Sequence, residues 1–236
     1  SLMNPILVAL DVDTPAKALA LADALRGAVG GFKIGKQLFT AAGPDMVRQL
    51  NARGDRVFLD LKFHDIPNTV AGAVQSAVGT GAWMVNVHAS GGSAMMKAAA
   101  EAATKAAAVS GAAKPLVIGV TVLTSMTDAA LREVGVDRPM VDQVVHLAKL
   151  AKASGLDGVV ASPQEITAIR AACGPDFQIV TPGIRPADQQ GKDDQARTLT
   201  PAEAIQAGAT HLVIGRPITG APDPRKAAEA ILATLP

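Results

Sequence analysis

Short runs of apolar, often β-branched residues alternate with longer alanine- and leucine-rich stretches along the whole chain. The short runs are continuously apolar. This is typical of parallel strands covered by helices on both faces, rather than of strands with one solvent-exposed face. We expect strands at Ile6–Leu10, Gly31–Ile34, Val57–Leu61, Met84–Val87, Leu116–Val122, Gly158–Ala161, Gln178–Val180 and His211–Ile214. We expect helices at about 15–27, 38–53, 68–80, 93–108, 140–154, 163–172, 201–207 and 223–234.

Signals at the helix ends support this division. Thr14 places a capping residue before a first-turn proline, and both Ser162–Glu165 and Thr200–Glu203 have the sequence of a capping box. Glycines such as Gly54 and Gly155 separate a helix from the next strand. Repeated strand–helix units in a chain of 236 residues predict an α/β fold, a (β/α)₈ TIM barrel that forms a single domain over residues 3–236.

An open, doubly wound sheet is the alternative architecture. That fold would carry a glycine-rich nucleotide loop after the first strand, and Asp11-Val12-Asp13 stands there instead. Ser1 and Leu2 precede Met3, and we interpret them as a remnant of cloning outside the domain.

The composition narrows the class of protein. A net charge of +1 with no long basic run argues against nucleic acid and acidic membranes as partners. Aromatic residues make up 3% of the chain and tyrosine is absent, so stacking on bases is a poor explanation of function. One cysteine, Cys173, fits a reducing compartment, and the sequence shows no secretory signal and no apolar run of about 20 residues. We therefore expect a cytoplasmic protein.

Charged and polar residues gather where the expected strands end, whereas the strand bodies carry almost no charge. Barrel enzymes place their working groups at the carboxyl ends of the strands. So many charges on one rim favour a site for a polar, anionic ligand over scattered structural ion pairs. The residues at these ends are Asp11, Lys33, Asp60, Lys62, His88, Thr124, Ser125, Ser162, Gly183, Arg185, Gly215 and Arg216.

Two arginines, Arg185 and Arg216, follow the last two strands, each close to a glycine. Barrels commonly hold phosphate at this place, and the planar guanidinium group makes paired bonds to phosphate oxygens. The long polar stretch 187–199 lies between the same two strands, which favours a loop over the active-site face. The pattern predicts a phosphorylated substrate.

The segment Asp60–Thr69 carries two carboxylates and an ammonium group within six positions, directly after an apolar run. On a strand Asp60 and Lys62 project to the same side, so they are expected to meet. A structural ion pair is the simpler alternative. With Lys33 and Asp65 nearby, however, Lys62 is expected to stay protonated, to stabilise a developing carbanion and then to give it a proton. A Schiff-base lysine would need the opposite, desolvated surroundings.

These motifs resemble those of the orotidine 5′-monophosphate decarboxylases. Members of that family are dimeric (β/α)₈ barrels that convert orotidine 5′-monophosphate to UMP in pyrimidine biosynthesis without a cofactor, and the resemblance implies the same here. The matching pieces are Leu10-Asp11, Phe32-Lys33, Asp60–Thr69, Val85–Ala89, Val122–Ser125, Thr181–Arg185, Asp194–Arg197 and Ile214–Ile218.

The resemblance also implies roles for individual residues. Lys62 would protonate C6 of the pyrimidine, with Asp60, Lys33 and Asp65 completing the catalytic charges. Asp65, Ile66 and Thr69 would enter the site of the neighbouring subunit. Asp11 and Lys33 are assigned to the ribose and Thr124 to the pyrimidine edge, and the phosphate is assigned to Arg185, Gln195, Gly215 and Arg216.

Two rival readings stay open at this point. Related lyases that share the Asp-x-Lys-x-x-Asp strand resemble magnesium enzymes, with an acidic ligand at the end of the second strand. This chain has Lys33 there, and no spacing of His, Asp or Glu suggests a zinc site, so we expect no metal and no cofactor. A non-catalytic barrel that binds phosphorylated metabolites would keep the two arginines but would have no need of Lys62.

Overall fold

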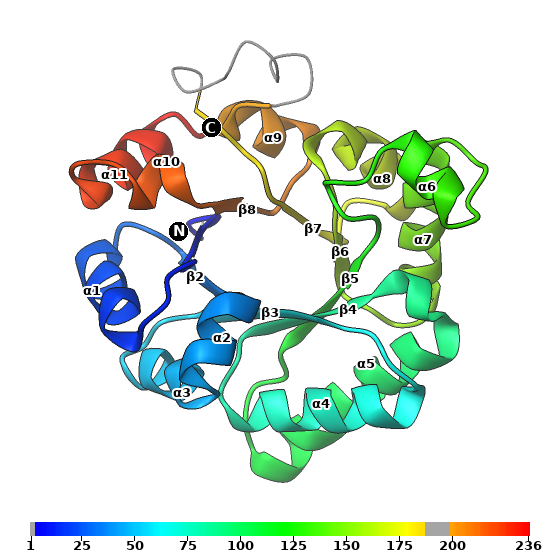
Figure 1. Ribbon diagram of the computed structural model, residues 1–236, viewed down its shortest axis with the longest axis horizontal. Helices are drawn as coiled ribbons and strands as arrows, with labels where there is room; N and C mark the ends of the chain where they lie inside the picture. Colours follow the sequence, from blue (N-terminus) through cyan, green and yellow to red (C-terminus); the bar gives the residue numbers. More distant parts are fainter. Residues whose placement is uncertain (1–2, 187–198) are drawn as a thin grey trace.

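The computed structural model describes residues 3–186 and 199–236. Within them, parallel strands close into a barrel in chain order, β1 to β8, with β8 paired to β1 (Figure 1). This confirms the (β/α)₈ barrel and excludes the open sheet. The strands are β1 Ile6–Ala9, β2 Gly31–Ile34, β3 Val57–Phe63, β4 Met84–His88, β5 Leu116–Val120, β6 Gly158–Val160, β7 Gln178–Thr181 and β8 His211–Ile214.

Helices surround the barrel as an outer layer (Figure 1). No helix in the two described stretches of chain is long and apolar enough to cross a membrane. The helices are α1 Pro15–Leu25, α2 Lys36–Ala42, α3 Asp45–Ala52, α4 Pro67–Gly79, α5 Ser93–Ser110, α6 Asp128–Glu133, α7 Met140–Ala153, α8 Ile166–Cys173, α9 Pro201–Ala207, α10 Arg216–Thr219 and α11 Pro224–Ala233, with short 3₁₀ turns η1 Ala89–Gly91 and η2 Pro163–Glu165.

Several expected helix boundaries were wrong. The single helix expected over 38–53 is two helices, because Gly43 ends α2 with a φ of 73° and Pro44 stands at the start of α3. The helix expected over 163–172 begins as the turn η2. The short helices α6 and α10 were not predicted, since neither is long enough to show a helical period.

The capping signals were right in two places and wrong in one. Thr14 accepts a hydrogen bond from the backbone of Lys17, and Thr200 and Glu203 form a complete capping box. Ser162 makes no such bond, because its segment starts with a 3₁₀ turn.

The strands are apolar on both faces because they separate two cores. Leu7, Phe58, Met84 and Val213 belong to a cluster inside the barrel. Ile6, in contrast, belongs to the larger cluster between the barrel and the helices, as do many residues of the strands' outward faces. This arrangement explains why the strands read as continuous apolar runs in the sequence.

An aromatic pair lies at the amino-terminal end of the barrel, just before β4 and at the start of β8. The ring centroids of Trp83 and His211 lie 5.2 Å apart at 69°, and the Arg56 guanidinium lies 5.4 Å from the Trp83 centroid. His211 is buried, and this burial together with the positive charge of Arg56 lowers its pKa to about 4. The neutral imidazole is therefore packed against Trp83 at this end of the barrel.

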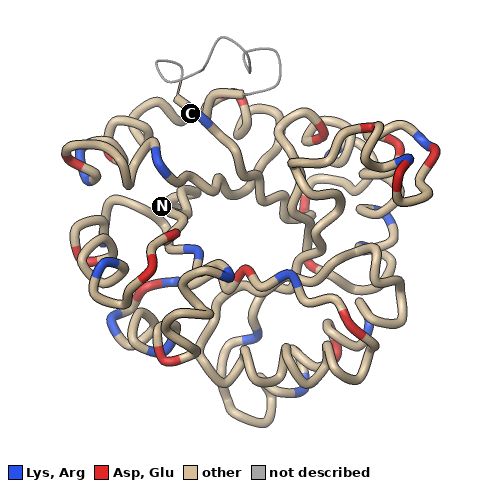
Figure 2. The backbone as a smooth tube through the Cα atoms, viewed as in Figure 1, with Lys and Arg blue, Asp and Glu red and all other residues tan. Residues whose placement is uncertain are grey.

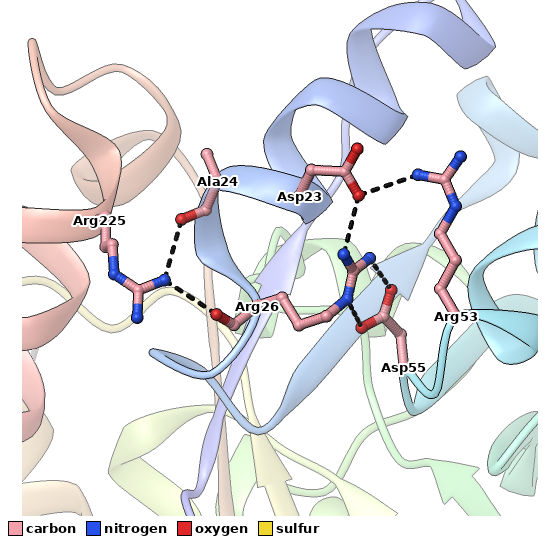
Figure 3. Close-up of polar contacts among 6 residues, drawn as sticks. All are labelled: Asp23, Ala24, Arg26, Arg53, Asp55 and Arg225. Atoms are coloured by element: carbon pink, nitrogen blue, oxygen red, sulfur yellow. Dashed lines mark hydrogen bonds and ion pairs between the residues drawn. The ribbon is translucent and has the colours of Figure 1, made fainter.

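An ion-pair network ties the first helix to both of its neighbours (Figure 3). Arg26 donates two parallel hydrogen bonds to the buried Asp55 carboxylate, at 2.8 and 2.6 Å, and a third to Asp23. Arg53 reaches the same Asp23 from α3's carboxyl end. On the other side, Arg225 of α11 donates to the carbonyl of Arg26 at 2.8 Å, which joins the last helix to the first.

Candidate active site

A cavity of about 320 Å³ opens at the carboxyl ends of the strands. Apolar side chains such as Phe58 and Val213 form part of its lining. Its charged groups lie on β2 and β3 and just after the end of β1. In Figure 2 the part of the inner ring around β3 carries blue and red segments in alternation. The lining residues are Ala9, Asp11, Lys33, Phe58, Asp60, Lys62, Val120, Val122, Leu123, Thr124, Val160, Pro182, Gly183, Val213 and Gly215.

Asp60 is the centre of the charged cluster. Lys62 Nζ donates to Asp60 Oδ1 at 2.8 Å, and Lys33 Nζ lies 3.2 Å from Asp60 Oδ2. Lys33 Nζ is also 3.8 Å from Asp11 Oδ1. The sequence prediction that Asp60 and Lys62 share a face is confirmed, and one carboxylate holds two ammonium groups beside the cavity.

The ionised form of Asp60 is favoured despite its burial. Burial alone raises the pKa of this carboxyl, but the nearby charges of Lys33 and Lys62, and hydrogen bonds from Lys62 and Asn86, outweigh it and bring the pKa below the usual value. The cavity therefore presents a fixed negative charge flanked by two amines.

The backbone of β3 is irregular at this point. Leu59 pairs with Val85 and Phe63 with Val87, so that the three residues Asp60 to Lys62 lie opposite Asn86 alone. Lys62 has a φ of 50°. Among the described residues it is the only one other than glycine with a positive φ. A left-handed lysine costs about 1 kcal/mol, so the surroundings must hold it in place.

Asn86 is the site residue that sequence reasoning missed. Its side chain is 1% exposed, donates from Nδ2 to Asp60 Oδ1 at 2.8 Å, and accepts at Oδ1 from the Lys62 backbone N–H at 2.9 Å. The only signal in the sequence was a polar residue inside the apolar strand expected over Met84–Val87. A buried amide of that kind needs partners, which here are both in the charged cluster.

Asp65 lies apart from this cluster within the chain. It is exposed, as are Ile66 and Thr69, and its carboxylate accepts a hydrogen bond from the backbone of Ile66 at 2.7 Å. Ile66 is 65% exposed, which is unusual for a large apolar side chain next to a charged cavity. The structure thus joins Lys33, Asp60 and Lys62 but leaves Asp65 facing outward.

The structure describes four of the remaining predicted binding residues, and two of these line the cavity. Thr124 and Gly215 line the cavity, and Thr124 also lines a neighbouring open groove of about 730 Å³. Arg185 and Arg216 follow β7 and β8 and are exposed, and neither makes an ion pair within the described part of the chain. Gln195 lies outside the described residues.

Two histidine rings, tilted by 39° to each other, lie near Lys62. The rings of His64 and His88 have centroids 5.3 Å apart. Burial lowers the pKa of His88, and the positive charges of Lys36 and Lys62 and the neighbouring His64 add to this effect. His88 is therefore a neutral neighbour of the cluster.

Residues 3–186 and 199–236 contain no group of three or more His, Cys, Asp or Glu side chains placed to hold a metal ion.

Comparison with known proteins agrees with this geometry. The profile of the "Orotidine 5'-phosphate decarboxylase / HUMPS family" matches residues 4–231. The chain belongs to this family. It is similar to the orotidine 5′-phosphate decarboxylase of Moorella thermoacetica, with 57% identity over 98% of this chain and 92% of the relative. The enzyme of the same name from Paramagnetospirillum magneticum is 53% identical over 99% of each chain.

A solved structure with the same name is also similar throughout. The crystal structure of orotidine 5′-phosphate decarboxylase from Lactobacillus acidophilus matches with a TM-score of 0.86 and 41% identity, over 97% of each chain. The family and its fold therefore agree with the barrel and the charged rim described above.

Proposed function

We propose that this chain decarboxylates orotidine 5′-monophosphate to UMP without a cofactor, and that Lys62 protonates C6 of the pyrimidine. Family membership supports the reaction. The single observation that carries the mechanism is the contact of Lys62 Nζ with Asp60 at 2.8 Å on the wall of the cavity. A non-catalytic binding barrel would have no use for this buried arrangement of charges.

The reaction needs a proton donor and fixed charge. When the bond from C6 to the carboxylate breaks, carbon dioxide leaves and the electron pair stays on C6. An ammonium group placed there beforehand stabilises that pair and then transfers its proton to it. Lys62 becomes a neutral amine in this step and regains a proton from solvent. UMP is the product, and no electron acceptor is required.

Asp60 would position the donor. Its carboxylate takes Lys62 on one oxygen and Lys33 on the other, which fixes both amines relative to the cavity. In this proposal Asp60 lies near the substrate carboxylate, and Lys33 with Asp11 binds the ribose hydroxyls.

The rim would bind the rest of the nucleotide. The exposed guanidinium groups of Arg185 and Arg216 suit a phosphate, with Gly215 allowing its close approach and Gln195 adding an amide. Thr124, on both the cavity and the adjoining groove, would bind the pyrimidine edge. Binding energy at the phosphate can then orient the ring at the distant reacting carbon.

A dimer with shared sites completes the proposal. Asp65, Ile66 and Thr69 are exposed and point no group into their own cavity. Beside them, Asn68 begins a groove of about 690 Å³ between α4 and α5, whose lining includes four alanines and two glycines. Small side chains allow a second copy of the chain to pack closely there. Asp65 would then enter the partner's cavity.

Replacement of Lys62 tests the proposed donor. The variant Lys62→Ala is expected to lose at least about 1,000-fold in kcat, since it removes both the proton and the stabilising charge. It should still bind UMP, because the phosphate and ribose contacts remain. Lys149→Ala, on the exposed side of α7, is the matched control and should keep wild-type turnover. A Lys62→Ala enzyme with near wild-type kcat would refute the donor assignment.

A further inference from the structure

We infer that Asn86 is a positioning residue for the charged cluster, acting through Asp60 and Lys62 rather than on the substrate. This inference rests on the proposed function of the same site. Asp60 and Lys62 line the cavity, whereas Asn86 does not. Asn86 lies one layer deeper, 1% exposed, on the inner face of β4.

The nitrogen and the oxygen of the Asn86 amide bind different residues. Nδ2 donates to Asp60 Oδ1, the same oxygen that receives Lys62 Nζ, with both distances at 2.8 Å. Oδ1 accepts from the Lys62 backbone N–H at 2.9 Å. Because a carboxylate only accepts and a backbone N–H only donates, just one orientation of the amide satisfies both partners. A single side chain therefore fixes the carboxylate and the lysine together.

The irregular pairing of β3 with β4 makes these two hydrogen bonds of Asn86 necessary. Between Leu59 and Phe63 the pairing of β3 with β4 shifts, and Asn86 alone lies opposite the three residues Asp60 to Lys62. Lys62 N–H then has no regular ladder partner, and its left-handed backbone points the side chain back toward Asp60. The Asn86 oxygen replaces the missing ladder acceptor. Without it, the Lys62 backbone would lose this acceptor, and only the contact with Asp60 would hold the ammonium group in place.

An introduced carboxyl at this position gives a distinctive test. In Asn86→Asp the protonated acid can copy the amide, since its hydroxyl donates to Asp60 and its carbonyl oxygen accepts from Lys62 N–H. Once ionised, it places a second negative charge against Asp60. The other ionisable groups around the pair are Lys33 from β2, Lys62 itself and His88 at the end of β4.

The expected result is a pH-dependent loss of kcat. The ratio of Asn86→Asp to wild-type kcat should be highest at low pH and fall about tenfold per unit of pH once the introduced acid ionises. Asn86→Ala should lose about 100-fold in kcat, the scale of a misplacement near 1 Å, at every pH. KM should change less than about threefold in both, since Asn86 itself does not line the cavity.

A control and a substitute variant separate positioning from plain stability. Thr80→Val removes another buried hydrogen bond, from Thr80 Oγ1 to the Ala77 carbonyl at 2.6 Å, at the far end of α4. It should lower the melting temperature and leave kcat unchanged. If Asn86→Ala does not fold, the smaller polar variant Asn86→Ser replaces it and should still lose at least about tenfold in kcat.

The outcomes also separate this inference from the proposed function. If the wild-type chain does not convert orotidine 5′-monophosphate, the proposed function fails. If the wild type does so, but folded Asn86 variants keep wild-type kcat, or if the Asn86→Asp ratio does not change with pH, the positioning role is refuted.

Discussion

His211 should make the protein less stable as the pH falls below 6.5. The side chain is 7% exposed and packs edge-on against Trp83. Burial, aided by the charge of Arg56, lowers its pKa from 6.5 to about 4. In the unfolded chain the imidazole is solvated and titrates near its ordinary value.

The sign and size follow from proton binding. Above pH 6.5 neither state carries the proton, so His211 adds nothing to the pH dependence. Between pH 6.5 and 4 the unfolded chain binds a proton that the folded chain refuses, and the free energy of unfolding falls as the pH falls. The pKa difference is 6.5 − 4 = 2.5. At 1.36 kcal/mol per unit, the loss reaches about 3 kcal/mol at pH 4, and about 2 kcal/mol at pH 5.

Urea unfolding at pH 7.5 and pH 5.0, followed by circular dichroism, measures this loss. The wild type is compared with His211→Gln, which cannot titrate, so that the carboxylates common to both chains cancel. We expect the difference between the two proteins to shift by about 2 kcal/mol in favour of the variant at pH 5.0. His146→Gln, on an exposed part of α7, should retain the wild-type pH dependence. A difference that stays constant within about 0.5 kcal/mol would refute the buried neutral imidazole.

The other predictions concern the ion-pair network and the shared site. Asp55→Ala should lower the free energy of unfolding by about 2 to 3 kcal/mol, because it leaves Arg26 without its buried partner. Glu229→Ala, which breaks an exposed ion pair at 2.9 Å, should lower it by under about 1 kcal/mol. Equal losses in urea unfolding would contradict this. Mixing inactive Lys62→Ala and Asp65→Ala proteins should restore about a quarter of wild-type turnover, since half the dimers then hold one intact site. No recovery after verified subunit exchange would place both residues in one chain's site.

The barrel could be predicted because its physical cause is written in local pattern. Strands buried between two cores must be apolar on both faces, and the sequence shows this directly in runs such as the one that became β1. The break between α2 and α3 was missed, although Gly43-Pro44 is a strong turn signal inside an otherwise helical stretch. The helix α10, with four residues, carries too little periodicity to be seen.

The site was predictable only where its parts are close in the sequence. Asp60 and Lys62 lie two residues apart on one strand, so the strand period predicted their contact, although the left-handed backbone of Lys62 could not be foreseen. The part played by Asn86 depends on a register shift between two strands, and register cannot be read from composition or spacing. The outward position of Asp65 has the same origin, because it depends on how the chain leaves the irregular end of β3.

The most direct test of the central claim is the ultraviolet spectrum of orotidine 5′-monophosphate mixed with the purified chain in excess chelator. The account predicts a rapid change to the spectrum of UMP with the wild type and almost none with Lys62→Ala. An unchanged spectrum with folded wild-type protein would contradict the proposed reaction. Activity that disappears with chelator and returns with magnesium would instead favour the metal-dependent lyases.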